Sequence, residues 1–188
     1  MRRFFGSKRA LGTPVANLIV VVAAVLLSLT VTSFAMNVTT SQVQKENMFI
    51  TSSHLWYTNS TYSTCAIAVT NTGPTDIVLT RLVIKGLQCT WNGSTNFVVY
   101  CKTNQTLPGD LSYVANLTNT ENNTITIANA PYVFAVAGEG LTLKSGWTMM
   151  FYIAVPDRVM VYDLGQPVRI VLSTTQAVYC SETNVQTA

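Results

Sequence analysis

The most reactive side chains in this sequence are four cysteines, Cys65, Cys89, Cys101 and Cys180. Four cysteines allow three pairings into two bonds, and in an exported protein disulfides are expected in place of free thiols. We predict a Cys89–Cys101 disulfide, because the interval contains Asn92-Gly93 and would form a hairpin loop. Cys65 and Cys180 would then join the first and last strands and close a long loop, which is the more stabilising kind of cross-link.

Groups that could transfer protons or attack a substrate are scarce. His54 is the only histidine, and the sequence has no CxxC pair, so close ligand pairs of the kind that zinc uses are missing. The sequence has no Gly-x-Ser-x-Gly turn and no phosphate-binding glycine loop. Asp157 and Asp163 flank a short strand-like piece, residues 158–162, and are either a carboxylate pair or two separate solvated acids. We therefore predict no catalytic residues, no metal, no cofactor and no enzymatic activity.

Modification sites are more numerous than catalytic groups. Asn-x-Ser/Thr sequons, which accept N-linked glycans in exported proteins, occur six times, at Asn37, Asn59, Asn92, Asn104, Asn116 and Asn122. Such glycans would solubilise a surface that lacks charge and would mask strand edges. We predict a glycosylated surface on which only part of the sequons are used.

Charge is low and unevenly distributed. The 188 residues are 48% hydrophobic and 10% charged, with a net charge of +3 from eleven bases and eight acids. Four of the bases lie in the first nine residues, so the count from residue 10 onward is seven bases minus eight acids, or −1. A nucleic-acid-binding protein would carry a basic stripe on its folded part, and a disordered chain would combine high net charge with few apolar residues. Both classes are excluded.

A long apolar run follows the basic N-terminus. The 22 residues from Val15 to Met36 carry no charge, and only Asn17, Ser28, Thr30, Thr32 and Ser33 are polar. A helix of this length spans a bilayer, and the four preceding bases keep the N-terminus in the cytoplasm and send the rest outward. Two ordinary interpretations are a secretory signal peptide that is cut near Ser33-Phe34-Ala35 and a permanent single-span anchor.

The residues in front of this run carry a more specific signal. The segment Ser7-Lys8-Arg9-Ala10-Leu11-Gly12-Thr13-Pro14-Val15 resembles the class III signal peptide of archaeal type IV pilins. The resemblance implies that a prepilin peptidase recognises Lys8, Arg9 and Ala10 and cuts before Leu11, which leaves the helix on the mature protein. Bacterial pilins usually have Glu as the fifth mature residue, where this chain has Val15, and archaeal members commonly lack that Glu.

The resemblance implies a filament subunit. The helix would anchor the protein in the membrane and then, through an assembly ATPase and a membrane platform, join a helical homopolymer at the cell surface that serves adhesion. An archaellin of a swimming filament is the nearest relative of this interpretation. An alternative of a different class is a monomeric, membrane-anchored or secreted β domain that binds a sugar or a cell-surface partner. Ala24, Ser28 and Thr32 lie four residues apart, and such small-residue spacing lets helices approach closely.

The rest of the chain predicts β structure. Short strand-like segments separated by Gly, Pro and Asn are typical of an all-β sandwich, and their order also resembles the β domain of archaeal pilins. We expect strands at Tyr62–Thr70, Asp76–Ile84, Phe97–Cys101, Thr124–Ala128, Tyr132–Val136, Trp147–Val155 and Val168–Thr174. The predicted fold is α+β, with a leader at 1–10, a hydrophobic helix and stem at 11–53, and a pilin-like, Ig-like sandwich at 54–188.

Overall fold

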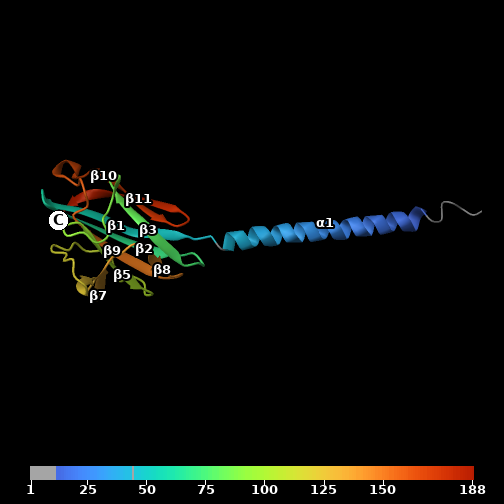
Figure 1. Ribbon diagram of the computed structural model, residues 1–188, viewed down its shortest axis with the longest axis horizontal. Coiled ribbons are helices and arrows are strands. Elements are labelled where there is room, and N and C mark those ends of the chain that lie inside the picture. The colour runs from blue at the N-terminus through green and yellow to red at the C-terminus, as the bar shows by residue number, and fades with distance from the viewer. Residues whose placement is uncertain (1–11, 44) are drawn as a thin grey trace, which may run out of the picture. The chain divides into compact units, whose positions relative to one another are not determined.

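The computed structural model describes residues 12–43 and 45–188 of the chain (Figure 1). It contains one long N-terminal helix and a β-rich region that begins at Lys45, and the two form separate compact units. The predicted class, an apolar helix followed by a β-rich domain, is confirmed at this level.

The helix α1 runs from Gly12 to Val43. Pro14 lies in its first turn, where the missing N–H would have no intrahelical partner. Val, Ile and Thr are modest helix formers in water, but an apolar environment forces every backbone group to bond within the helix. The next element is a strand that starts at Met48, so residues 48–53, which the sequence placed in a helical stem, belong to the β-rich unit.

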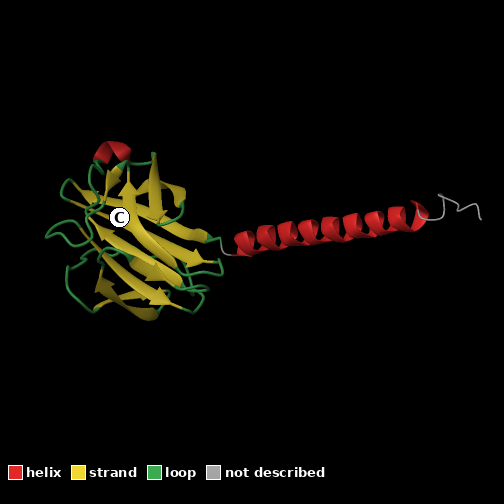
Figure 2. Cartoon of the chain, turned by 45° about the vertical axis from the view of Figure 1, so that its right-hand side comes forward, coloured by secondary structure: helices red, strands yellow, loops and turns green. Residues whose placement is uncertain are grey.

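The β-rich unit is built on one eleven-stranded sheet (Figure 2). The strand order along the sheet is β4-β3-β10-β11-β1-β2-β9-β5-β7-β6, with β8 paired to β3. All the strand pairs are antiparallel except β1 with β11. The strands are β1 (Met48–Asn59), β2 (Tyr62–Asn71), β3 (Ile77–Ile84), β4 (Leu87–Gln88), β5 (Phe97–Thr103), β6 (Asn123–Ile127), β7 (Ala130–Val136), β8 (Leu141–Leu143), β9 (Thr148–Ala154), β10 (Pro167–Thr174) and β11 (Val178–Thr187).

Two hydrophobic clusters lie on opposite faces of the central strands. Side chains of a strand alternate between its faces, so Cys65, Ile67 and Val69 of β2 belong to the first cluster, whereas Ala66 and Ala68 belong to the second. Successive residues of β9 also alternate between the first and the second cluster. Because both faces are buried, these strands read as continuous apolar runs. Strands β3 and β10 share the first cluster with β2 and β9, although they are distant in the strand order.

The second cluster is covered by the segment that connects β5 to β6 and by the β6–β7 hairpin. Leu111 and Leu117 of the connecting segment are buried against β2 and β9, as is Phe134 of β7. The Tyr152 hydroxyl donates to the Ser112 carbonyl at 2.8 Å, and the Leu117 N–H donates to the Tyr62 hydroxyl at 3.0 Å. These contacts hold a loop without regular structure firmly against the sheet.

The turn after β2 fixes the point where the chain enters the β-rich unit. Asn71 is fully buried, and its side-chain nitrogen donates to the carbonyls of Thr75 at 2.8 Å and Leu143 at 3.1 Å. The Gly73 N–H bonds both the Asn71 side-chain oxygen and the Asn47 carbonyl at 2.9 Å. A Cβ on Gly73 would lie 2.6 Å from the Asn47 nitrogen, so the close approach requires glycine here.

Candidate functional site

The surface of α1 is the first candidate site. The 27 residues Pro14–Thr40 are long and apolar enough to cross a membrane, and at 1.5 Å per residue they extend about 40 Å, more than the roughly 30 Å of a bilayer core. No charged residue occurs from Gly12 to Val43, and large apolar side chains are exposed along the whole helix. A helix that is apolar on all sides is stable when it is buried. This surface is compatible with burial in lipid or against other protein, and an apolar helix near the N-terminus is equally compatible with a secretory signal.

The polar residues of α1 do not oppose such burial. The Thr32 hydroxyl donates to the Ser28 carbonyl at 2.8 Å, and Thr30, Thr39 and Thr40 make equivalent bonds of 2.8 Å to carbonyls three or four residues earlier. A hydroxyl that bonds its own helix costs little when it is removed from water, because its hydrogen-bonding capacity is already used. The predicted small-residue face, Ala24, Ser28 and Thr32, lies within this helix.

The predicted leader residues Lys8, Arg9, Ala10 and Leu11 lie outside the described residues. The helix begins directly after them, at Gly12. The predicted cleavage point therefore remains a prediction that rests on the sequence.

All six sequon asparagines are exposed. Asn37 lies in α1, where a glycan would compete with burial of the helix, and the other five lie in the β-rich unit at strand ends or in loops. Asn92 follows β4 and Asn122 precedes β6, and these two strands are the edges of the sheet. Exposure satisfies the steric requirement for modification, and glycans at Asn92 and Asn122 would shield unpaired strand edges.

The predicted Cys89–Cys101 and Cys65–Cys180 disulfides are not supported, because the structure has all four cysteines as free thiols. Cys89 is buried in the first cluster, whereas Cys101 packs against the second cluster, on the other face of the sheet. Cys65 is fully buried in the first cluster, whereas Cys180 is exposed on β11. A disulfide requires Cα atoms about 4.4–6.8 Å apart and Cβ vectors that converge. The two predicted partners of each pair lie on different faces of the sheet or differ in burial, because strand register sets the direction of each side chain.

Burial changes the chemistry of these thiols. It raises the pKa of Cys65 well above its usual value, with the nearby Cys89 as a further cause, and it raises the pKa of Cys89 to about 12. Burial also raises the pKa of Cys101. The thiolate is the reactive form, so these three groups are expected to be inert at neutral pH.

His54 takes part in a small polar cluster on β1. Ser52, His54 and Trp56 alternate along one face of the strand, and Asp110 of the β5–β6 loop lies beside them. The Ser52 hydroxyl donates to Asp110 Oδ1 at 2.5 Å, and His54 Nε2 lies 2.8 Å from Asp110 Oδ2. The Ser52 hydrogen bond is the main cause that lowers the pKa of Asp110, and the His54 bond adds to it. The carboxylate therefore stands between the hydroxyl and the imidazole.

This order differs from that of a hydrolase triad. A serine nucleophile bonds the imidazole, which in turn bonds the carboxylate. Here the serine hydroxyl donates to the carboxylate, and no hydrogen bond joins it to His54 among the described residues. The His54 ring is also stacked on Trp56, with ring centroids 5.2 Å apart. The cluster orders the loop at Asp110 and gives no geometry for nucleophilic attack.

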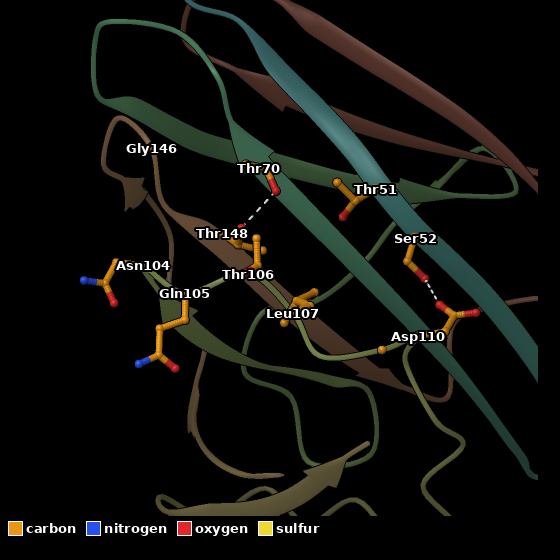
Figure 3. A pocket seen from close by; sticks show the side chains of 11 residues that line it. Thr51, Ser52, Thr70, Asn104, Gln105, Thr106, Leu107, Asp110, Gly146 and Thr148 are labelled. Atoms are coloured by element: carbon orange, nitrogen blue, oxygen red, sulfur yellow. Dashed lines mark hydrogen bonds between the residues drawn. The ribbon is translucent and has the colours of Figure 1, made fainter. Parts of the chain in front are cut away.

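Asp110 also closes one end of a pocket in the β-rich unit (Figure 3). Its volume is about 500 Å³. Residues of β1, β2 and β9 form the floor of the pocket, and the β5–β6 loop forms its wall. Figure 3 shows Asp110 and Ser52 at one end and Asn104 and Gln105 at the other. The lining side chains are hydroxyls, amides, one carboxylate and one leucine, from Thr51, Ser52, Thr70, Asn104, Gln105, Thr106, Leu107, Asp110 and Thr148, with Gly109 and Gly146.

Asp157 and Asp163 do not form a carboxylate pair. Asp157 accepts a hydrogen bond from Asn96, whereas Asp163 forms an ion pair with Lys85 at 2.7 Å. Burial would raise the pKa of Asp163, but the hydrogen bonds from Lys85 and the Met160 N–H, with the Lys85 charge, lower it. The ion pair anchors a loop that carries the exposed Tyr162. The two acids therefore serve as separate structural contacts.

Comparisons with known proteins add no assignment. No family model and no curated protein matches this chain. Within the described residues, no group of three or more His, Cys, Asp or Glu side chains could hold a metal ion.

Proposed function

We propose that this chain is a structural subunit of an extracellular filament of the archaeal type IV pilus kind, a pilin assembled through its N-terminal helix. The observation that carries the proposal is α1, which is uncharged from Gly12 to Val43 and exposes apolar side chains along its length. Such a surface suits two successive environments, the bilayer before assembly and a bundle of identical helices afterwards. The Ser7–Val15 segment in front of it adds the resemblance to a prepilin leader.

The resemblance to archaeal type IV pilins also implies how the subunit would be processed and assembled. A prepilin peptidase would recognise Lys8, Arg9 and Ala10 and release residues 1–10, and an assembly ATPase with its membrane platform would add the subunit to a helical homopolymer. The β-rich unit would be an Ig-like sandwich on the outside of the filament. The first cluster supports the sandwich, because β3 and β10 share it with β2 and β9. The exposed sequons of the β-rich unit support its place on the outside of the filament. The filament would serve adhesion.

A second candidate is a membrane-anchored or secreted monomer whose β domain binds a ligand, and the 500 Å³ pocket, with hydroxyl and amide side chains in its lining, favours it. The two candidates differ in what covers α1, since lipid alone suffices for an anchored monomer. We propose no catalytic role for either, because Asp110 separates Ser52 from His54. Nucleic acid is not a partner in either, because the chain has no basic stripe.

Charge reversal in the leader tests the proposal in cells that produce the filament. Arg9→Glu places an acid next to the predicted cleavage point and should leave uncut precursor in the membrane, with no filaments. Arg3→Glu makes the same charge change six residues upstream and is the matched control, for which cleavage should continue. The readouts are the mass of the subunit and electron microscopy of the cell surface. Normal filaments from the Arg9→Glu strain would refute the assigned leader.

A further inference from the structure

The pocket between the sheet and the β5–β6 loop has a lining that the filament proposal does not use. Its volume of about 500 Å³ lies within the range of roughly 300–1,000 Å³ that is usual for small-molecule sites. The hydroxyls of its floor come from neighbouring strands, because Thr70 of β2 pairs with Thr148 of β9, which pairs with Thr103 of β5. The Thr70 and Thr148 hydroxyls are 2.9 Å apart, and the dashed line in Figure 3 joins them.

The wall of the pocket is held in place without a ligand. Leu111 directly after Asp110 is buried in the second cluster, and its N–H donates to Asp110 Oδ1 at 2.9 Å. At the other end of the wall, the Gln105 N–H donates to the Thr103 hydroxyl at 3.1 Å. Polar groups that are fixed before binding lose little conformational entropy when a ligand arrives. The loop therefore holds its backbone at Gln105 and the Asp110 carboxylate in a set arrangement.

The lining selects a class of ligand. An anionic ligand would meet the Asp110 carboxylate, and among the described residues that line the pocket there is no Lys or Arg to offset the repulsion. An apolar ligand would cover the Asp110 carboxylate and the exposed amides of Asn104 and Gln105 without offering them a hydrogen bond, which is costly. A neutral polyol avoids both costs, because it carries no charge and each of its hydroxyls can donate and accept a hydrogen bond. The Asp110 side chain is 67% exposed, so its oxygens can accept hydroxyls from a bound ligand.

We propose that this pocket binds a neutral saccharide. The inference goes beyond filament assembly and does not depend on it, because the pocket lies wholly within the β-rich unit. The saccharide has two possible sources, a glycan of another cell or surface, and the N-linked glycan of this chain, since the sequon residue Asn104 lies at the end of the pocket remote from Asp110 (Figure 3). Both sources have the same chemistry, and the experiment separates them.

The test uses the full chain from a host without N-glycosylation, kept in a phosphocholine detergent because maltoside headgroups would compete. Saturation-transfer NMR measures binding of maltose, cellobiose and N,N′-diacetylchitobiose, with glucuronic acid as the charged comparison. At least one neutral probe should bind and glucuronic acid should not. Asp110→Asn should raise the Kd about tenfold or more, because hydrogen bonds to a charged acceptor are the strong ones, and Gln105→Ala should raise it about threefold.

Glu139→Gln and Thr142→Val are the matched controls, because both residues are exposed and neither lines the pocket; they should leave the Kd unchanged. Gln105 is an exposed loop residue, so its variant keeps the test valid if Asp110→Asn disturbs folding. The glycosylated chain and its Asn104→Gln variant identify the source. Binding by both indicates an external glycan, and binding only after Asn104→Gln indicates the chain's own glycan. Absence of neutral-saccharide binding in all forms, preference for glucuronic acid, or equal loss in the control variants would overturn the proposal.

Discussion

Leu26 and Val133 provide a matched pair for testing whether α1 is buried in the working protein. Leu26 lies near the middle of the Pro14–Thr40 stretch, and Val133 lies on β7 in the β-rich unit. In the single chain the two side chains are 58% and 56% exposed. If the monomer were the functional form in water, an aspartate at either position would therefore be about equally well tolerated.

The proposal predicts a large difference between the two variants. At the centre of a membrane helix, leucine contributes about −0.3 to −0.6 kcal/mol and aspartate about +2.5 to +3.5 kcal/mol to insertion. Leu26→Asp should therefore cost about 3–4 kcal/mol, which lowers the equilibrium for insertion or helix packing by two to three orders of magnitude. Val133→Asp changes an exposed strand position and should cost no more than about 1 kcal/mol.

The assay is the amount of subunit in filaments sheared from cells, compared with the amount in the membrane and in the medium. Filaments should be absent for Leu26→Asp and present in wild-type amounts for Val133→Asp. Wild-type filaments from Leu26→Asp would refute the burial of α1. Equal loss from both variants would show that the assay reports a general folding defect, and the assignment of the helix as the assembly element would then lose its support.

Three further predictions concern the β-rich unit. Asn71→Ala should lower the stability by about 2–3 kcal/mol, because three hydrogen bonds of a buried amide are lost, and an unchanged Tm would contradict this. In the native protein iodoacetamide should label the exposed Cys180 and leave Cys65 unlabelled until unfolding; a Cys65 that stays unlabelled in denaturant without reductant would instead indicate a disulfide. Because the folded-state pKa of Asp163 is lowered, its ion pair with Lys85 stabilises the fold above the ordinary carboxyl pKa, and this stabilisation is lost as the pH falls through the lowered value. Lys85→Met should raise the Asp163 pKa in an NMR titration and move acid unfolding to higher pH, and an unchanged titration would contradict the ion pair.

Much of the β-rich unit could be predicted because its central strands are buried on both faces. All seven predicted segments correspond to strands, and the run at β9 is apolar at nearly every position. Strands β1 and β11 were not predicted for the opposite reason. Residues 51–54 of β1 are all polar and show no apolar alternation, and in β11 the outward positions Cys180, Glu182 and Asn184 interrupt any apolar pattern. The pairing of β1 with β11 joins segments that are far apart in the sequence, so the local residue pattern cannot predict it.

The candidate pocket could not be predicted from spacing, because its lining comes from four segments that are distant in the sequence. One sequence signal for it exists: Thr70 and Thr148 are polar residues that adjoin the apolar runs of β2 and β9. The cysteines show the same limit. The predicted hairpin at Asn92-Gly93 does not join two paired strands, because β4 pairs with β3, whereas β5 pairs with β7 and β9. The face that each of Cys89 and Cys101 takes depends on strand register, which is set across the sheet.

The N-terminal sequence of the mature protein, determined on filaments or on the membrane fraction, tests the central claim most directly. The account predicts that the mature chain starts at Leu11, so that the whole of α1 is retained for insertion and assembly. A start at Met36 would contradict it, because most of the apolar helix would have been removed with a secretory signal. An intact N-terminus would also contradict it, since a plain membrane anchor needs no cleavage before Leu11.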